Sequence, residues 1–410
     1  GPIIQGAGIV GGYVGSTKTC AVVAAVHPGR RPADPLEILG LGVTRSEGMN
    51  GPNIGDIEAV TQAVRTAVRQ AEATAGREVE AAYVSVPSGS VRTSRSKGVL
   101  QVSGSEITPA DVKRVQEVGR AVPIPPGHEL IHALSQRYAV DHRDGIRDPE
   151  GMAGTRLEAD LCIVTADVAI CHDLAKVVDR AGYRPDELVM APLATALAVL
   201  ADAEREAGVA LVEIGGATTD VLVYGGHRIL HAATLPWGGS IVTRDIARGL
   251  GVHEDEASQL KERHGGALRD RADSQELLDV SGARHGRARR VSRELLLHII
   301  EQRLDEILGL VYEELETSGT LNELEAGIVL SGGGVSLAHT EDLARSVFNL
   351  PVRTGIPSLG LTGMAEGLAR PSYSTATGLV LYGASRAAAG GLVGATRAFA
   401  RVGGWLREFF

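Results

Sequence analysis

The sequence predicts an α/β fold made of two related halves, with a separate subdomain inserted into the first half. Of the residues, 44% are hydrophobic but only 3% are aromatic, so the core is expected to consist of Val, Leu, Ile and Ala side chains in layered helices and strands. A strand, a glycine-rich turn and a second strand open both halves, at residue 8 and at Val209. The chain of 410 residues is also too long for one core, which favours roughly two to four subdomains.

The first half is expected to begin with strands at 8–26 and 38–45, followed by a helix. Asp56 is the predicted N-cap of this helix, and Gly76 marks its end. Between them, apolar side chains recur at helical spacing, at Ile57, Val60, Val64, Ala67, Val68 and Ala71. A strand at 80–86 completes this part.

The insertion begins where the composition becomes polar and rich in Gly and Ser, in "SGSVRTSRSKGVLQVSG". A short helix is expected from Thr108 onward. "LEADLCIVTAD" restores a buried strand, so the insertion is expected to end near residue 163, before a helix at 168–182. The apolar run at 188–201 is shorter than the ~20 residues that cross a bilayer, and we interpret it as a core helix.

The second half repeats the opening plan in "VALVEIGGATTDVLVYGG". Two helical stretches follow, separated by a charged segment at 264–290, and the second keeps an apolar stripe from Leu296 to Leu315. "AGIVLSGGGVSL" is expected to form a strand that runs into a glycine turn, with a helix at 340–347. After Tyr382 come a stretch of small residues and the terminal "RAFARVGGWLREFF".

The net charge and the cysteine content exclude some classes of protein. The net charge of −9 argues against a general nucleic-acid binder, which needs a basic face. Cys20, Cys162 and Cys171 lie far apart in apolar runs, which indicates core thiols in a reducing compartment. No nucleic-acid partner is therefore expected.

Three glycine-rich turns follow buried strands and form the candidate phosphate site. Glycine lets backbone amides approach an anion closely, and neighbouring hydroxyls add donors. Each turn alone is equally well explained as a tight turn, but three at repeat-related positions favour a phosphate clamp. The turns contain Gly11, Gly12 and Gly15; Gly215 and Gly216 with Thr218 and Thr219; and Gly332, Gly333 and Gly334.

Several stretches together resemble one family of proteins. "VALVEIGGATTDVLVYGGHRILHAATLPWGGSIVTRDIARGL" resembles the second phosphate segment of the FtsA family of cell-division proteins, and the likeness continues in order through "GIVLSGGGVSL", "LPVRTGIP", "PSYSTATGLVLYG" and "WLREFF". The resemblance implies an actin-like (ribonuclease H-like) two-domain fold, with a 1C insertion in place of subdomain 1B. It also implies polymerisation and peripheral attachment to the cytoplasmic face of the bacterial inner membrane at the division site, where FtsA tethers the tubulin-like FtsZ.

The same resemblance implies how the chain is divided. Subdomain 1A takes 3–82, 164–207 and 363–388, the 1C insertion 83–163, subdomain 2A 208–248 and 322–362, and subdomain 2B 249–321, followed by a flexible linker at 389–396 and an amphipathic helix at 397–410. By the resemblance, the region around 250–320 faces FtsZ. The 1C insertion serves contacts between subunits and with later division proteins.

Four positions depart from the pattern that the resemblance implies. Tyr13 stands where an acid is expected, and Ala191 where a glutamate would orient the attacking water. Glu213 replaces an aspartate, and Ser258 a glutamate that would touch the ribose. Mg²⁺ binding is expected to be weakened, and losing the water-orienting group typically removes roughly 10² to 10⁴ in rate. Hydrolysis is expected to be slow or absent; the alternative is an active ATPase in which Glu213 and an unrecognised group support turnover.

Binding is a separate question, because many expected contacts remain. ATP or ADP is expected as a structural ligand that holds the two halves together. The alternative is an empty, closed cleft in which Tyr13 fills the phosphate space. The expected nucleotide contacts are Gly12, Tyr13, Gly15, Ser16, Thr17, Lys18, Glu213, Gly215, Gly216, Thr218, Thr219, Gly239, Ser258, Lys261, Gly332, Gly333 and Gly334.

"HELIH" at 128–132 matches the HExxH pattern of metalloproteases, whose chemistry needs a helix. Prolines precede it and a strand-like stretch follows, so a strand is expected instead. His128 and His132 would then lie some 13 Å apart at ~3.3 Å per residue, too far for one zinc.

Two basic clusters are interpreted as solvated loops, with the partner surfaces as the alternative. They are Arg92, Arg95 and Lys97 in the insertion, and Arg284, Arg287, Arg289 and Arg290 in the second half.

The terminal segment has the pattern of an interfacial helix. One face carries Phe399, Val402, Leu406, Phe409 and Phe410 with Trp405 at its border, opposite Arg397, Arg401 and Arg407. We expect weak binding to anionic membrane lipids, which polymerisation multiplies; the alternative is a helix docked on the protein's own core. A sugar kinase or chaperone on the same core would need no such tail.

Overall fold

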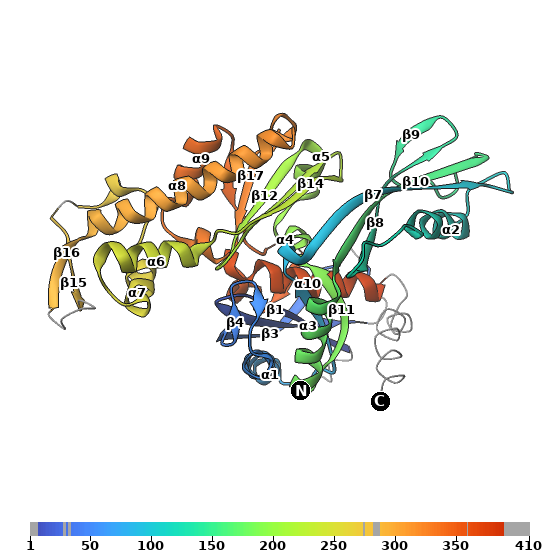
Figure 1. The fold of residues 1–410 in the computed structure, drawn as a ribbon. Helices are drawn as coiled ribbons and strands as arrows, with labels where there is room; N and C mark the ends of the chain where they lie inside the picture. The colour runs from blue at the N-terminus through green and yellow to red at the C-terminus, as the bar shows by residue number, and fades with distance from the viewer. Residues whose placement is uncertain are drawn as a thin grey trace.

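The computed structural model describes residues 7–27, 30–31, 34–273, 275–281, 288–358 and 360–388. Two lobes, each built on one β-sheet, lie beside a third unit that projects to one side (Figure 1). The first lobe carries the N-terminal strands together with the last described helix, α10 (Ser374–Ala388). The predicted α/β fold with an inserted unit is therefore confirmed.

The two lobes have the same strand order, as expected for an internal repeat. In each sheet, three antiparallel strands are followed by two parallel ones. The first sheet contains β3 (Leu36–Arg45), β2 (Lys18–Val26), β1 (Ala7–Val14), β6 (Ala81–Val86) and β11 (Arg184–Met190), with β19 (Leu361–Gly363) beside β3. The second contains β14 (Arg228–Leu235), β13 (Thr219–Gly225), β12 (Val209–Ile214), β17 (Ile328–Ser331) and β18 (Val352–Thr354).

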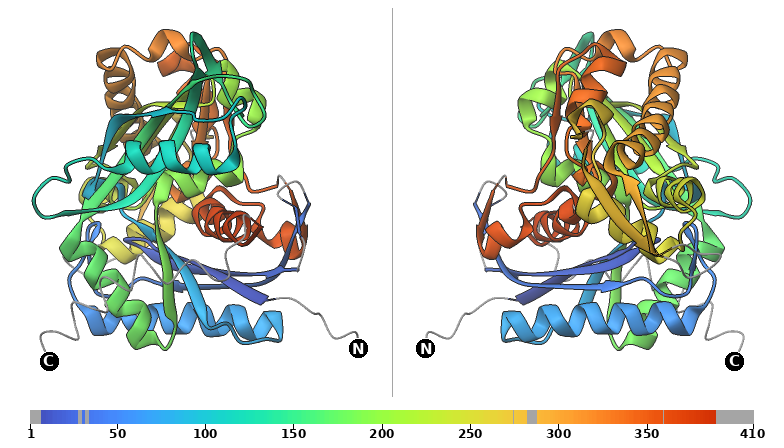
Figure 2. Two further views of the ribbon diagram at one scale, coloured as in Figure 1. Left: turned by 90° about the vertical axis from the view of Figure 1, so that its right-hand side faces the viewer. Right: turned by 90° about the vertical axis from the view of Figure 1, so that its left-hand side faces the viewer.

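Helices cover both faces of the first sheet. α1 (Ile57–Ala75) begins at the predicted cap, because the Asp56 carboxylate accepts the N–H groups of Glu58 and Ala59, and it ends at Gly76 in the left-handed conformation. α1 and α3 (Val168–Ala181) pack on one face, while α4 (Ala191–Val199) and α10 pack on the other. Figure 2 shows α1 and α10 on opposite sides of this sheet.

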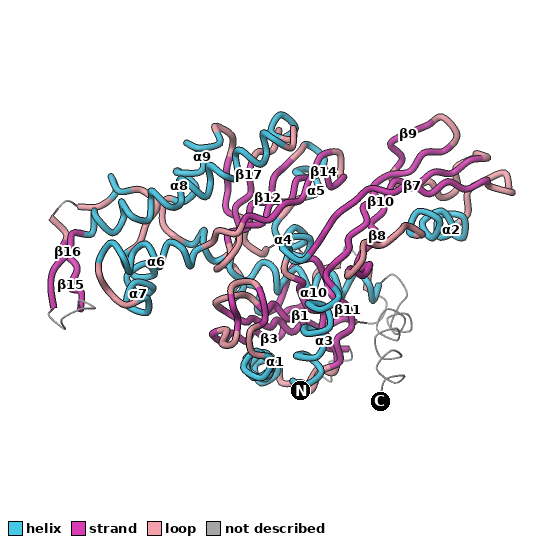
Figure 3. The backbone as a smooth tube through the Cα atoms, in the orientation of Figure 1, coloured by secondary structure: helices cyan, strands magenta, loops and turns pink. Residues whose placement is uncertain are grey.

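The core of the second lobe is built from the predicted apolar stripe. α6 (Gly239–Leu250), α8 (Arg293–Thr317) and α9 (Thr340–Phe348) pack against the second sheet. Seven stripe residues of α8 are buried: Leu296, Ile300, Leu304, Ile307, Leu308, Val311 and Leu315. α7 (Glu254–His264) and the hairpin of β15 (Leu277–Ser281) and β16 (Ala288–Ser292) extend the lobe away from the insertion (Figure 3).

The inserted unit is a four-stranded sheet with one helix. Its strand order is β7 (Val91–Gln101), β10 (Arg156–Asp167), β8 (His128–Val140) and β9 (Arg143–Ile146), and α2 (Pro109–Arg120) packs on it. α2 begins with a capping box between Thr108 and Asp111. The expected bounds of the insertion, 83 and 163, fall inside β6 and β10, because both strands run on past the residues where the composition changes.

The inserted sheet packs on both lobes. Cys162 and Val164 of β10 share an apolar cluster with Met190 of the first lobe and Leu222 of the second. In addition, the Gln136 side chain accepts the backbone N–H of Ile229 at 2.7 Å. The insertion is therefore joined to each half of the molecule. Two short strands, β4 (Met49–Asn50) and β5 (Asn53–Ile54), and α5 (Asp202–Ala207) complete the α-helices and β-strands of the described residues.

Two kinds of prediction differ from the structure. The basic residues expected in solvated loops lie in paired strands, with Arg92, Arg95 and Lys97 in β7 and Arg289 and Arg290 in β16. The apolar run at 188–201 is not a single core helix, because Leu188 to Met190 belong to β11, where they pair with β6. The helix α4 begins only at Ala191, with Pro192 in its first turn, where a missing N–H costs nothing. Apolar content alone did not reveal the change from strand to helix.

"HELIH" forms part of the strand β8, as predicted. His132 is buried, and its Nε2 atom accepts the backbone N–H of Met190 at 3.1 Å. Burial lowers the pKa of His132 to about 4, so the ring is neutral at pH 7 and able to accept this bond. His128 instead lies at 3.3 Å from the Thr165 hydroxyl.

We expect His132→Ala to lower the free energy of unfolding by about 1–3 kcal/mol, because the Met190 N–H would stay buried without an acceptor. Urea unfolding monitored by circular dichroism measures this. His128→Ala, in the same strand but with a partly exposed ring, is the matched control and should cost much less. Equal losses in the two variants would count against the role of the Met190 bond.

None of the helices in the described part of the chain is both long and apolar enough to traverse a lipid bilayer. The predicted linker at 389–396 and the predicted amphipathic helix at 397–410 lie outside the described residues, as do Arg284 and Arg287.

Candidate nucleotide cleft

The first two glycine turns meet between the lobes. The β1–β2 turn carries Ser16 and Thr17, and the β12–β13 turn carries Gly216. A Cβ atom placed on Gly216 would lie 2.4 Å from the Ser16 hydroxyl oxygen and 2.7 Å from the Thr17 methyl group. The two turns are thus in direct contact, and a larger residue at 216 would displace the Ser16 and Thr17 side chains.

The third turn lies beside residues from α6 and α7. A Cβ atom on Gly239 would be 3.8 Å from the Lys261 ammonium and 4.0 Å from Gly334 Cα, so the structure brings these three residues together. Lys261 Nζ donates to the Gly239 carbonyl at 3.1 Å and to the Thr243 hydroxyl at 2.7 Å. Burial lowers the pKa of Lys261.

Several backbone amides of the turns already have partners. Gly15 and Gly215 donate within their own hairpins, to Lys18 and Thr218. Gly239 donates to Gly215 at 2.8 Å and Gly332 to Pro371 at 3.2 Å. In this conformation these four amides cannot also bind a phosphate.

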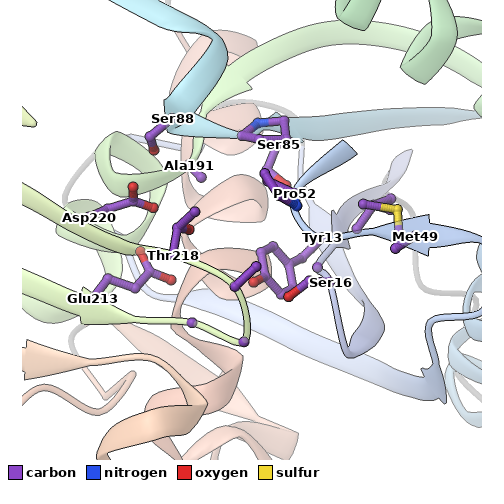
Figure 4. Close-up of a pocket in the computed structure, with 16 residues that line it drawn as sticks. Tyr13, Ser16, Met49, Pro52, Ser85, Ser88, Ala191, Glu213, Thr218 and Asp220 are labelled. Carbon is purple, nitrogen blue, oxygen red and sulfur yellow. The ribbon is translucent and has the colours of Figure 1, made fainter. Parts of the chain in front are cut away.

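Tyr13 lines the cavity between the turns. Its ring folds over Gly15, where a Cβ atom would come within 2.6 Å of it. Figure 4 shows Tyr13 between Ser16 of the first turn and Thr218 of the second. Burial raises the pKa of the Tyr13 phenol above its usual value, and the carboxylates of Glu213 and Asp220 raise it further.

The cavity beside Tyr13 is small. Its volume is about 50 Å³, whereas pockets that bind cofactors usually measure about 300–1,000 Å³. It can hold a few water molecules but no triphosphate. ATP therefore does not fit this cavity, but a second cavity of about 400 Å³ is lined by the tips of the same turns, at Ser16 and Gly216, and by Ser240 of α6. The residues that line the smaller cavity include Tyr13, Ser16, Met49, Pro52, Ser85, Ser88, Ala191, Glu213, Thr218 and Asp220.

Glu213 links the lobes at the base of the cleft. Its carboxylate accepts the Thr195 hydroxyl of α4 at 2.8 Å and the Thr375 hydroxyl of α10 at 2.7 Å, both from the first lobe. Burial raises the pKa of Glu213, while the two hydroxyls and Lys18 oppose the rise. Hydrogen bonds from these two protein hydroxyls therefore hold the Glu213 carboxylate in place.

Asp220, which sequence reasoning missed, lies directly across from Glu213 in the β12–β13 pair. It accepts the Thr234 hydroxyl at 2.8 Å. Burial, and then the charge of Glu213, raise the pKa of Asp220 to about 7. The sequence does contain a signal for Asp220: if the strands on either side of the "GGAT" turn are paired antiparallel, Glu213 and Asp220 lie opposite each other.

We expect Asp220→Asn to stabilise the protein at pH 8 but not at pH 4. The folded state holds the Asp220 proton up to about pH 7, whereas the unfolded state releases it near pH ~3.9, so stability from this group falls as the pH rises between these values. The two pKa values differ by about 3 units, so the gain at pH 8 should be up to about 4 kcal/mol. Urea unfolding of both proteins at each pH measures it, and an equal difference at pH 4 and pH 8 would contradict the assignment.

The other predicted site residues are dispersed. Ala191 begins α4 and lines the cavity without a polar side-chain atom. The Lys18 ammonium lies 4.6 Å from the centre of the Tyr373 ring, and burial lowers its pKa to about 8. Thr219 donates to the Trp237 carbonyl, and Ser258 to Glu262 at 3.3 Å. Among the described residues, no group of three or more His, Cys, Asp or Glu side chains is placed to hold a metal ion.

Comparison with solved structures shows the fold. The PilM–PilN type IV pilus biogenesis complex matches with a TM-score of 0.62 at 16% sequence identity, over 93% of this chain and 99% of that one. MreB5 of Spiroplasma citri, a structure bound to ADP, matches with a TM-score of 0.57 at 12% identity, over 94% and 99% of the chains. The fold is thus actin-like.

Comparison of sequences is more specific. Residues 210–378 match the model of the family "Cell division protein FtsA", and residues 88–165 match that of the SHS2 domain inserted in FtsA. FtsA of Pseudomonas aeruginosa is 36% identical over 92% of this chain and 89% of its own length. FtsA of Escherichia coli K12 is 34% identical over 98% of this chain and 96% of its own length. The chain therefore belongs to the FtsA family of cell-division proteins.

Proposed function

We propose that the chain is a scaffold of the bacterial division ring that polymerises and links FtsZ filaments to the cytoplasmic membrane. The observation that carries this proposal is the identity of 34% to FtsA of Escherichia coli across 98% of the chain, a coverage that cannot omit the whole terminal segment at 397–410. Membership of this family supports the position of the protein on the cytoplasmic face of the inner membrane at the division site.

Each part of the chain has a role in this proposal. Residues 250–320 contact FtsZ, and the inserted sheet contacts neighbouring subunits and later division proteins. The segment 397–410 binds anionic lipids through its apolar face and its arginines. One such helix binds weakly, so a polymer that presents many of them holds the membrane by avidity.

The proposal assigns the cleft a structural role, with weak or absent hydrolysis. ATP or ADP lies with its phosphates beside the two turns, where Ser16, Thr17 and Thr218 carry hydroxyl donors. Mg²⁺ is held weakly, because Tyr13 offers no negative charge and Glu213 is already bound to two hydroxyls. Ala191 has no group that orients water.

The membrane role is tested by sedimentation with lipid vesicles. The full chain should pellet with anionic vesicles at least about tenfold more than a chain ending at residue 390, and should carry FtsZ into the pellet. Leu406→Glu should abolish pelleting, because it places a charge on the apolar face. Glu408→Gln, its matched control on the polar face, should pellet as well as the unchanged chain. Equal pelleting of the full and shortened chains would refute the tether.

A further inference from the structure

The cavity of about 400 Å³ at the tips of the two phosphate turns is built by both lobes. The first lobe contributes Ser16 and the β4–β5 hairpin, and the second contributes the β12–β13 turn, α6 and the start of α7. Its volume is within the range of pockets that bind cofactors, about 300–1,000 Å³. Ser16, Pro52 and Thr218, which Figure 4 labels, line this cavity as well as the smaller one beside Tyr13, so the two spaces adjoin.

Hydroxyl groups and a single cation line the larger cavity. The hydroxyls belong to Ser16, Thr218 and Ser240. The cation is Arg244, which lies four residues after Ser240 on α6 and therefore on the same face of the helix. Among the described residues of this lining, Arg244 is the one positive charge and Glu254 the one negative charge. The cavity thus offers donors from both lobes and one guanidinium to an anion.

The Arg244 guanidinium is not engaged by other side chains. It is exposed, and it has no hydrogen-bond or ion-pair partner within the part of the chain that the structure describes. Asp245, its neighbour in sequence, instead binds Arg303, and Asp255 of α7 lies 3.4 Å from Arg45. Water solvates many exposed arginines in this way, but Arg244 is distinguished by its position in the lining of a cavity at the phosphate turns.

The acids that would hold Mg²⁺ in this cleft are absent or already engaged. Tyr13 carries no negative charge, and Glu213 accepts the hydroxyls of Thr195 and Thr375. A polyphosphate in the cleft therefore needs another source of positive charge. A guanidinium meets this need, because its planar fork binds phosphate oxygens bidentately and keeps its charge without a metal.

We propose that Arg244 binds the terminal phosphate of ATP or ADP in the larger cavity and supplies the positive charge that Mg²⁺ would otherwise supply. The chain then binds nucleotide without a divalent ion. This inference rests on the proposed function, in which the cleft is the nucleotide site. Phosphates held between Ser16 and Arg244 also join the two lobes, because these residues come from different lobes.

The test measures the Kd of ADP and of ATP by isothermal titration calorimetry on the full chain, in excess EDTA and in excess Mg²⁺. In EDTA the unchanged chain should bind both nucleotides within about threefold of its affinity in Mg²⁺. Arg244→Gln should raise the Kd in EDTA at least about tenfold, the loss expected for a hydrogen bond between charged groups. Arg244→Lys keeps the charge without the fork and should bind with intermediate affinity.

Arg248→Gln is the matched control. Arg248 lies one turn further along α6 and is also exposed, but it is not among the residues that line the cavity. Because the substitution removes the same charge from the same helix, it separates a general effect of charge from contact with the phosphate. Arg248→Gln should bind both nucleotides like the unchanged chain.

Three results would overturn the inference. These are equal affinity of the unchanged chain and Arg244→Gln in EDTA, equal losses in Arg244→Gln and Arg248→Gln, and binding by the unchanged chain that is more than about threefold weaker in EDTA than in Mg²⁺. In all three, nucleotide still binds and the proposed nucleotide site stands. If the unchanged chain binds neither nucleotide in either condition, the nucleotide site and the role of Arg244 are both wrong, whereas the vesicle experiment still tests the tether at 397–410.

Discussion

Replacing Gly378 with alanine should destabilise the protein by at least about 3 kcal/mol, because α10 crosses α4 at this residue without room for a side chain. An added Cβ atom would lie 1.7 Å from the carbonyl oxygen of Ala194 and 2.2 Å from its carbonyl carbon. Both are backbone atoms inside a buried helix, so neither is able to move away as a flexible side chain would. The two helices would have to separate, and Thr375 and Thr195 would be drawn away from Glu213.

Gly309 is the matched control for this substitution. It lies inside α8, and a Cβ atom there meets no atom within 4 Å. Gly309→Ala should therefore be neutral or stabilising by up to about 1 kcal/mol, because alanine favours the helix. Thermal and urea unfolding of both variants measure the contrast. If the two variants had similar stability, α4 and α10 would lie farther apart at Gly378 than they do in the structure.

The second large effect is expected in phosphate release. A double variant, Tyr13→Asp with Ala191→Glu, should hydrolyse ATP at least about 10²-fold faster than the unchanged chain, because it supplies both an acid for Mg²⁺ and a group that orients water. Both substitutions are needed. Ala191→Glu alone would crowd a cavity of about 50 Å³ that the Tyr13 ring already lines.

The control keeps a side chain of similar size and removes its polar atoms. Tyr13→Asp with Ala191→Leu should remain as slow as the unchanged chain, because leucine has no group that can orient water. Release of inorganic phosphate in the presence of Mg²⁺ is the measurement. If the unchanged chain turns over ATP as fast as the double variant, the alternative of an active ATPase supported by Glu213 is correct.

The sequence predicted the features that depend on residues close together in the chain. The α1 cap at Asp56, the strand β8 and the stripe of α8 all follow from local pattern, and the structure has each of them. The repeated turns were also visible, because glycine and hydroxyl residues follow strands in both halves. These features need no knowledge of how the lobes pack.

The arrangement of the site depends on contacts between segments that lie far apart in the chain, and local sequence patterns do not reveal such contacts. Lys18 remains a predicted nucleotide contact, and the sequence did not reveal that its ammonium lies over the ring of Tyr373, which comes from the far end of the chain. Asp220 becomes important only through the strand register that sets it opposite Glu213. Thr195 and Thr375 reach Glu213 because α4 and α10 cross. Tyr13 was recognised as unusual from the sequence, but its contact with Gly15 was not predictable.

The apolar cluster beneath the inserted sheet limits how far the inserted unit can be altered or removed. Cys162 and Val164 cover surface that belongs to both lobes, through Met190 and Leu222. A chain from which residues 91–167 had been excised would expose that surface to water and favour aggregation. Replacing the insertion with another unit would therefore require further substitutions where the two lobes contact it.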